Sequence, residues 1–263
     1  MKFRKSLIAL SLAAAALTGC NQSNVQSTAQ AEVSNQAVLT TYADIAQAKY
    51  EDSLITAKAL RKAVNQFLAA PTEANLQKAK DAWIAARVPY QQTEAYRFGN
   101  AIVDDWEGRV NAWPLDEGLI DYVANSYGNE SDENPFYTAN VIANKTLKLG
   151  GKTIDASVID KKLLAETLHE VDDVEANVAT GYHAIEFLLW GQDLNGNNPG
   201  AGNRPASDFD TANCTNGSCE RRRQYLSAAT DLLIDDLDEM ANNWTANGAA
   251  RQDLFGKGEK GGL

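Results

Sequence analysis

The chain has 263 residues and a formal net charge of −11, because 35 acidic side chains outnumber 24 basic ones. A chain this acidic lacks the basic patch that binding to nucleic acid requires, so nucleic acid is excluded as a partner. The length suffices for a large core within one or two domains. An acidic surface attracts cations, and it also helps to keep a protein soluble.

The N-terminus has the pattern of an export signal. Basic side chains at Lys2, Arg4 and Lys5 precede a run of small and apolar residues from 7 to 17. That run is too short to span a bilayer, which favours a cleaved lipoprotein signal peptide over residues 1–19.

The signal ends in Leu-Thr-Gly-Cys at Cys20, a sequence that resembles the lipobox of bacterial lipoproteins. This resemblance implies that Cys20 becomes the lipidated first residue and anchors the chain to a membrane. The alternative is an ordinary signal peptide with an incidental cysteine. Asn21, rather than Asp, follows the cysteine; by resemblance to sorting in Gram-negative bacteria, this favours an outer-membrane lipoprotein that faces the periplasm. The polar residues 20–36 predict a flexible tether.

Helical periodicity begins at Ala37, from which apolar residues recur at the spacing of one helix face. Pro71 ends this first helix, and Thr72 can cap a second one. Pro89 should kink the second helix. Residues 100–153 are rich in Asn, Asp, Gly and Pro, and they predict a long loop with short helical pieces.

Three helical segments follow that loop. The first begins near Asp155 or Asp160, and the second spans about 174–190. Residues 191–218, rich in Gly and Asn, predict a second loop, and residues 220–244 predict a long final helix.

Alternating strand patterns are nearly absent, so we predict an all-α fold, an up-and-down helical bundle over residues 37–245. Residues 246–263 end in a glycine-rich sequence without helical periodicity. We expect this segment to be a disordered or truncated tail.

Two cysteines remain after the proposed lipidation site, Cys214 and Cys219, five positions apart in a polar loop. An even pair this close in an exported protein predicts a local disulfide. The alternative is a pair of metal ligands, but thiolates outside the cytoplasm tend to oxidise and no histidine lies nearby.

The segment from Gly181 to Gly191 places His183 among apolar residues, with Glu186 three positions later. Positions three apart share a helix face, so the imidazole and the carboxylate should lie together. Such a pair is half of a metal site, or a base with its orienting partner. The alternative is a core histidine whose hydrogen bond to an acid satisfies both groups.

A third ligand is not evident. His169, the other histidine, precedes His183 by 14 positions, which in one continuous helix is about 21 Å along the axis. Joint coordination would require the chain to fold back, and otherwise further ligands must be carboxylates from other helices. The acids of residues 172–175 are interpreted as a solvated helix start, and Glu94 with Arg97 as a surface ion pair.

The Gly-x-His-x-x-Glu sequence at Gly181, His183 and Glu186 resembles the signature of the imelysin-like family of exported bacterial proteins. The resemblance covers roughly residues 37–245, and the subgroup it resembles is the iron-regulated lipoprotein branch. A second block resembles the same family and comprises Trp83, Arg87, Pro89, Tyr90, Thr93, Glu94, Arg97, Phe98 and Gly99, followed by residues 104–109 and 113–116.

This resemblance implies two helical bundles related by internal duplication, with a site at their junction. Family members are longer than this chain, so we expect only the first bundle here. The family motif makes His183 and Glu186 candidate ligands of a divalent metal ion, iron or zinc, and Glu94 is the first further carboxylate to test. Other motif residues carry over without an assigned role: Gly181, Arg87 and Arg97.

The resemblance also implies the function. The founding member was described as an insulin-cleaving membrane protease, whereas relatives take part in iron uptake and bind metal. Our first hypothesis is an outer-membrane lipoprotein in iron acquisition that binds a metal ion or metal complex, with iron-uptake components as partners. The alternative is a zinc-dependent peptidase of the insulin-cleaving type, in which a further acid activates a zinc-bound water. A third hypothesis is a structural or partner-binding helical bundle. In that case the His–Glu pair has no ligand, and the two side chains only form a hydrogen bond with each other in the core.

Overall fold

The computed structural model describes residues 34–262. The predicted signal peptide, Cys20 and residues 21–33 of the predicted tether lie outside the described residues. Within residues 34–262 the chain is mostly helical, as the sequence predicts. None of the helices in this part of the chain is both long enough and apolar enough to cross a membrane.

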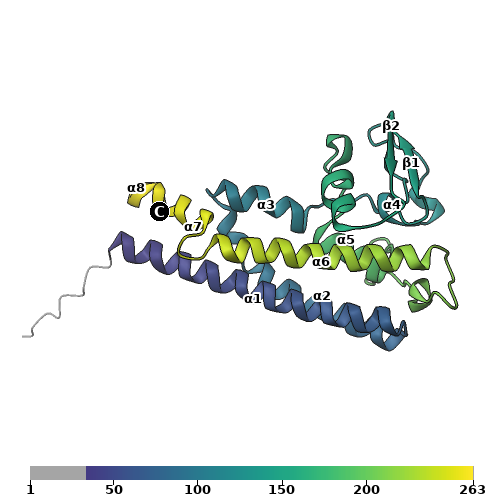
Figure 1. Cartoon of the computed structure of the whole chain (residues 1–263), viewed down its shortest axis with the longest axis horizontal. Coiled ribbons are helices and arrows are strands. Elements are labelled where there is room, and N and C mark those ends of the chain that lie inside the picture. The colour runs from purple at the N-terminus through teal and green to yellow at the C-terminus, as the bar shows by residue number, and fades with distance from the viewer. Residues whose placement is uncertain (1–33, 263) are drawn as a thin grey trace, which may run out of the picture. The chain divides into compact units, whose positions relative to one another are not determined.

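Three long helices form the frame. Helices α1 (Asn35–Ala69) and α2 (Glu73–Gln91) pair as a hairpin, and α6 (Cys219–Asn243) packs along α1 (Figure 1). The turn between α1 and α2 forms where predicted, and the Thr72 side chain caps α2 by accepting a hydrogen bond from the Asn75 amide at 3.3 Å. Pro89 lies within the last turn of α2.

Shorter elements cover this frame. The 3₁₀ turn η1 (Glu94–Arg97) leads into α3 (Ala101–Asn111), and α5 (Gly181–Trp190) packs against α2, α3 and α6. Helix α4 (Glu117–Ile120) and the 3₁₀ turn η2 (Asn125–Tyr127) follow α3.

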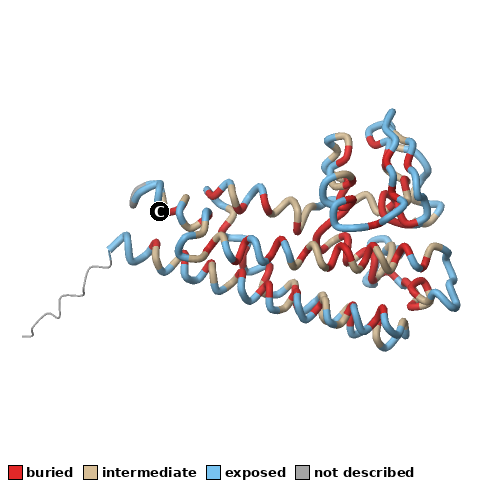
Figure 2. The backbone as a smooth tube through the Cα atoms, in the orientation of Figure 1, coloured by how far each residue is buried: buried red, intermediate tan, exposed pale blue. Residues whose placement is uncertain are grey.

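The burial pattern places the core between these helices. Buried stretches of α6 face both α1 and α5, whereas the outer sides of α1 and α2 are largely exposed (Figure 2). Tyr50 lies at one end of this core, and its ring centroid is 5.6 Å from that of Trp106 and 6.4 Å from that of Trp244.

The predicted disordered tail is wrong for residues 249–262. These residues form α7 (Ala249–Gly256) and α8 (Gly258–Gly262), which pack against the start of α1. Ala250 and Leu254 of α7 are buried. Burial of these two apolar side chains, one in each turn of α7, stabilises a helix that the nearby glycines alone would not favour.

The segment between α4 and α5 contains a hairpin that the sequence analysis missed. Strands β1 (Thr146–Leu149) and β2 (Lys152–Asp155) are antiparallel, with Leu147 opposite Ile154. Strands of four residues give too short an alternation to stand out from a loop. The π-helical turn η3 (Leu163–Leu168) lies after the hairpin.

Arg221 of α6 holds this segment to the bundle. Its guanidinium donates to the backbone carbonyls of Val141 and Ala156, both at 2.7 Å, and its Nε to that of Ile142 at 2.8 Å. Burial lowers the pKa of Arg221. The buried guanidinium is compensated by backbone carbonyls, which keeps the cost of its burial low.

The helix that carries the His-x-x-Glu pair begins at residue 181, not near 174 as predicted. Residues 171–173 form the 3₁₀ turn η4 (Val171–Asp173), and the backbones of Asp172 and Asp173 have positive φ values of 62° and 58°. Asp172 pairs with Lys152 of β2. These acids therefore belong to a turn fastened to the hairpin and do not start a helix.

Candidate functional site

Close contacts with its neighbours fix the start of α5. At Gly181 the backbone has a φ of 77°, and a methyl group there would lie 2.5 Å from the Val110 carbonyl oxygen. The Thr180 hydroxyl donates to the Arg109 carbonyl at 2.8 Å, and the Trp83 indole N–H donates to the Tyr182 carbonyl at 2.9 Å. The glycine of the motif thus permits the close approach of α5 to the end of α3.

His183 and Glu186 lie together on the solvent-accessible side of α5. His183 Nδ1 and Glu186 Oε2 are 3.0 Å apart, as expected from their spacing. The His183 side chain is 17% exposed and that of Glu186 is 41% exposed, so a solute can reach both. The Trp113 ring centroid is 4.9 Å from that of His183, and Trp113 itself is 71% exposed.

The pair lines a cavity of about 280 Å³. Two further carboxylates, Glu117 and Asp193, line the same cavity, together with the apolar side chains of Leu115, Phe187 and Trp190. Burial is the main cause that raises the pKa of Glu117, and the negative charges of Asp193 and Glu186 raise it further, while Arg204 and Gln192 oppose the shift. The cavity therefore has an acidic lining that favours a cation.

His183 Nδ1 and Glu186 Oε2 lie at hydrogen-bond distance, and a metal ion that bound both would replace the proton between them and use them as two neighbouring ligands. Two ligand atoms 3.0 Å apart, each about 2.1 Å from an ion, subtend roughly 90° at it. That angle is the one between neighbouring ligands of an octahedral ion. Within residues 34–262, no group of three or more His, Cys, Asp and Glu side chains converges closely enough to hold an ion. This part of the chain therefore offers two close ligands and leaves other coordination positions open.

Residues of the second motif block line a different cavity. Glu94, Arg87 and Arg97 line a hollow of about 200 Å³ that does not include His183. Arg97 pairs with Asp104 at 3.0 Å and with Glu107 at 3.2 Å. The predicted Glu94–Arg97 pair is therefore wrong, and the structure does not bring Glu94 to the His183–Glu186 pair.

Arg87 has a packing role in the structure. Its guanidinium carbon is 4.9 Å from the ring centroid of Tyr182, and one of its nitrogens donates to Asn111 Oδ1 at 2.5 Å. Arg87 therefore packs against the first turn of α5, next to His183, without lining the acidic cavity. The sequence analysis assigned it no role.

His169 is not part of the site. Its Nδ1 lies 3.4 Å from the Thr180 hydroxyl, and burial lowers its pKa. The chain does fold back between His169 and His183, because the Glu170 amide donates to the Asn177 carbonyl at 2.8 Å. His169 nevertheless does not line the cavity around His183.

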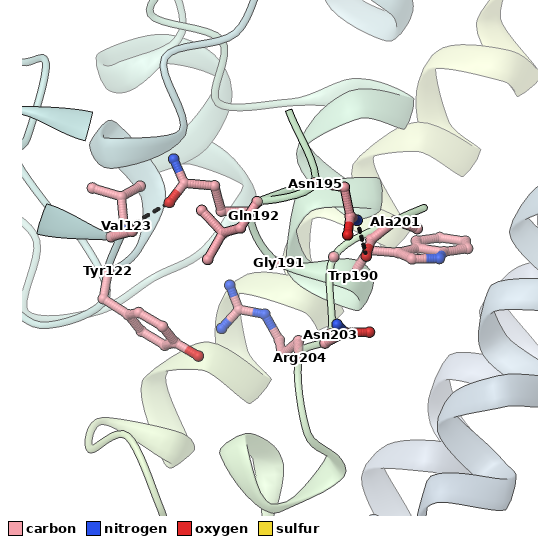
Figure 3. Close-up of a pocket in the computed structure, with 12 residues that line it drawn as sticks. Tyr122, Val123, Trp190, Gly191, Gln192, Asn195, Ala201, Asn203 and Arg204 are labelled. Atoms are coloured by element: carbon pink, nitrogen blue, oxygen red, sulfur yellow. Dashed lines mark hydrogen bonds between the residues drawn. The ribbon is translucent and has the colours of Figure 1, made fainter. Parts of the chain in front are cut away.

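A second cavity of about 280 Å³ backs onto the site (Figure 3) and shares Trp190, Gly191, Ala201 and Gly202 with it. Gln192 fixes one wall, because its Oε1 accepts a hydrogen bond from the Ala124 amide at 2.7 Å. The loop after α5 therefore lies between the two cavities, and contacts on both of its sides fix its position.

Buried ion pairs hold that loop. Arg204 donates to Asp121 at 2.6 Å and to Asp208 at 3.1 Å, and Arg222 donates to Asp121 at 2.6 Å. Each buried charge has an opposite partner, which is the condition for such a cluster to be tolerated.

The predicted disulfide is present between Cys214 and Cys219. Asn216, inside the disulfide loop, donates to Asp208 Oδ1 at 2.6 Å. The disulfide loop thus packs onto the same ion-pair cluster.

Sequence reasoning missed three residues of the site: Trp113, Glu117 and Asp193. Trp113 was recognised only as part of the second motif block, and its neighbour His183 is 70 positions away. Neither acid belongs to a spacing pattern, because both lie at loop or short-helix positions.

Comparisons with known proteins identify relatives of this chain in sequence and in fold. A family model described as Imelysin (Peptidase M75) matches residues 46–262. A protein of Synechococcus elongatus named iron-regulated protein A is 31% identical over 122 residues, which is 45% of this chain and 33% of that protein. The chain therefore spans only part of the length of this relative.

A solved structure has the same fold over part of its length. The crystal structure of a protein from Parabacteroides distasonis, provisionally named an iron-regulated protein A precursor, matches with a TM-score of 0.53 and 23% identity. The match covers 83% of this chain and 49% of that one. The fold described above thus corresponds to about half of that protein.

Proposed function

Because the chain belongs to the imelysin family and is a homologue of iron-regulated protein A, we propose that it binds a metal ion or metal complex for iron acquisition. The single observation that carries this proposal is the His183–Glu186 pair, held 3.0 Å apart in a solvent-accessible acidic cavity. Iron or zinc is the cargo, because an imidazole and a carboxylate are ligands that both metals accept.

Binding, rather than peptide hydrolysis, is the function that this donor set supports. A catalytic zinc commonly has three protein ligands and an open position for water. Here two donors lie close together, and Glu117 and Asp193 line the cavity without completing a closer group. Such a site can capture and release a cargo that brings its own ligands.

The test is a comparison of metal affinity by calorimetry, with Fe²⁺ under anaerobic conditions and with Zn²⁺. We expect wild type to bind one equivalent, and His183→Ala and Glu186→Gln to lose affinity by at least tenfold, because a lost ligand costs 1.4 kcal/mol or more. His169→Asn is the matched control, since it removes the other histidine and leaves the cavity intact. Equal affinity in wild type and His183→Ala would disprove the assignment.

We also propose that the protein is anchored through a lipid on Cys20 and faces the periplasm from the outer membrane. The lipobox sequence and Asn21 support this placement. Wild type expressed in a Gram-negative host should incorporate labelled palmitate and sediment with outer membranes, whereas Cys20→Ala should do neither. Wild type recovered unlabelled in the soluble periplasmic fraction would contradict the proposal.

A further inference from the structure

The cavity around His183 is much larger than one ion. Its volume is about 280 Å³, whereas one water molecule occupies roughly 30 Å³ in the liquid. A protein that binds bare ions tightly surrounds them with its own donors. Here only two donors lie close together, so a bound ion must complete its coordination with groups that are not from this part of the chain.

The cavity is also walled by aromatic rings. Trp113 is 71% exposed although its ring contacts His183 at a centroid distance of 4.9 Å. Trp190 lines the same cavity, together with Phe187. Exposure of an indole is costly in water, and a flat partner that stacks on it would recover that cost. A bare ion would make no use of these rings.

Charge restricts the cargo further. Glu117, Glu186 and Asp193 all line the cavity, and their carboxylates repel an anionic complex. A metal saturated by several anionic chelating groups would be disfavoured both by its charge and by its size. A metal with one small chelator keeps a net positive charge and leaves positions for the two protein donors.

We propose that the cargo of this site is a positively charged one-to-one complex of a metal ion with a small, flat, aromatic bidentate chelator. The His183 imidazole and the Glu186 carboxylate replace two waters on the metal, without a change in its oxidation state, and the chelator ring stacks on Trp113. This inference rests on the proposed metal-binding function, and it names the class of ligand that the site accepts.

The experiment uses Ni²⁺ as an octahedral, redox-stable probe. Calorimetry compares Ni²⁺ alone, Ni²⁺ with one equivalent of 2,2′-bipyridine, and Ni²⁺ with one equivalent of ethylenediamine. The two chelators both supply two nitrogen donors, but only bipyridine has rings. We expect the bipyridine complex to bind about fivefold more tightly than the ethylenediamine complex, as a favourable ring contact allows, and to quench tryptophan fluorescence.

Variants assign that difference to Trp113. Trp113→Ala should abolish the preference for the bipyridine complex, measured as the ratio of the two chelate affinities within the same variant, and Trp113→Phe should restore most of that preference. Phe98→Ala is the control, because Phe98 is 85% exposed but does not line this cavity. Each variant is compared with wild type by circular dichroism.

The outcomes separate the two proposals. If Ni²⁺ binds in a His183-dependent way but both chelates bind equally, the aromatic-chelate inference is wrong and the metal site stands. A preference that survives in Trp113→Ala would also overturn it. If neither Ni²⁺ nor its chelates depend on His183, the proposed function itself fails. Binding of free bipyridine at the same affinity would show a site for rings alone and would contradict the aromatic-chelate inference.

Discussion

At the scale of single residues, Gly181 shows why the motif needs its glycine. Its φ of 77° and the 2.5 Å distance from a methyl group to the Val110 carbonyl oxygen leave no room for a side chain. We expect Gly181→Ala to lower the free energy of unfolding by about 2 kcal/mol or more, because it adds both backbone strain and a clash. Urea denaturation measures this directly.

Gly108 provides the matched control, because it lies inside α3 and a methyl group there has no atom within 4 Å. Gly108→Ala should be neutral or raise stability by up to about 1 kcal/mol through helix propensity. Equal stabilities of the two variants would contradict a packing role for Gly181. A shift of α5 in Gly181→Ala should also weaken metal binding.

The residue scale also separates what spacing can and cannot predict. His183 and Glu186 were expected to lie together because a helix places positions three apart on one face, and they do. Glu94 and Arg97 have the same spacing, but Arg97 instead pairs with two acids of the next helix. Sequence spacing predicts only which side chains lie close together within one helix. A charged side chain that also reaches another element can form its ion pair there instead.

At the scale of elements, the contact between α3 and α6 contains an ion pair that makes stability depend on pH. Asp236 of α6 is buried and lies 3.1 Å from Arg109 of α3. Burial, aided by Glu239 and Asp235 and opposed by Arg109 and Lys161, raises the pKa of Asp236 to about 6. The folded state therefore binds this proton more tightly than the unfolded state, and stability from this group is lost as pH rises through about 6.

Asp236→Asn should remove this dependence. Between pH 5 and pH 7.5 the free energy of unfolding of wild type should fall relative to that of the variant by roughly 1.4 kcal/mol, because about one pH unit of this range lies below the pKa of Asp236. Asp238→Asn, an exposed neighbour on α6, controls for loss of a surface charge. Parallel stability curves for wild type and Asp236→Asn would contradict the raised pKa.

Elements with long apolar periodicity were predictable, and those set by distant contacts were not. The helices α1, α2 and α6 follow from apolar stripes that continue over many turns. The hairpin of β1 and β2 depends on the carbonyl contacts of Arg221, which lies more than 60 positions away along the chain. The late start of α5 depends on the backbone of Val110, and no local pattern encodes it.

At the scale of the whole described chain, the bundle acts as a rigid support for one irregular segment. The cavity residues come from α4, from α5 and from the loops on either side of them. Buried ion pairs of Arg204 and Arg222 fasten the loop after α5, and Arg221 fastens the hairpin. The match spans 33% of the length of the curated relative and 49% of the solved one.

The central claim is that one metal ion binds between His183 and Glu186. Anomalous diffraction from crystals soaked with Fe²⁺ or Zn²⁺ tests it most directly, because it locates the ion independently of affinity. We predict one strong peak within about 2.3 Å of both the His183 imidazole and the Glu186 carboxylate, and its absence in His183→Ala crystals. Ordered peaks elsewhere, with none at this pair under saturating metal, would contradict the account.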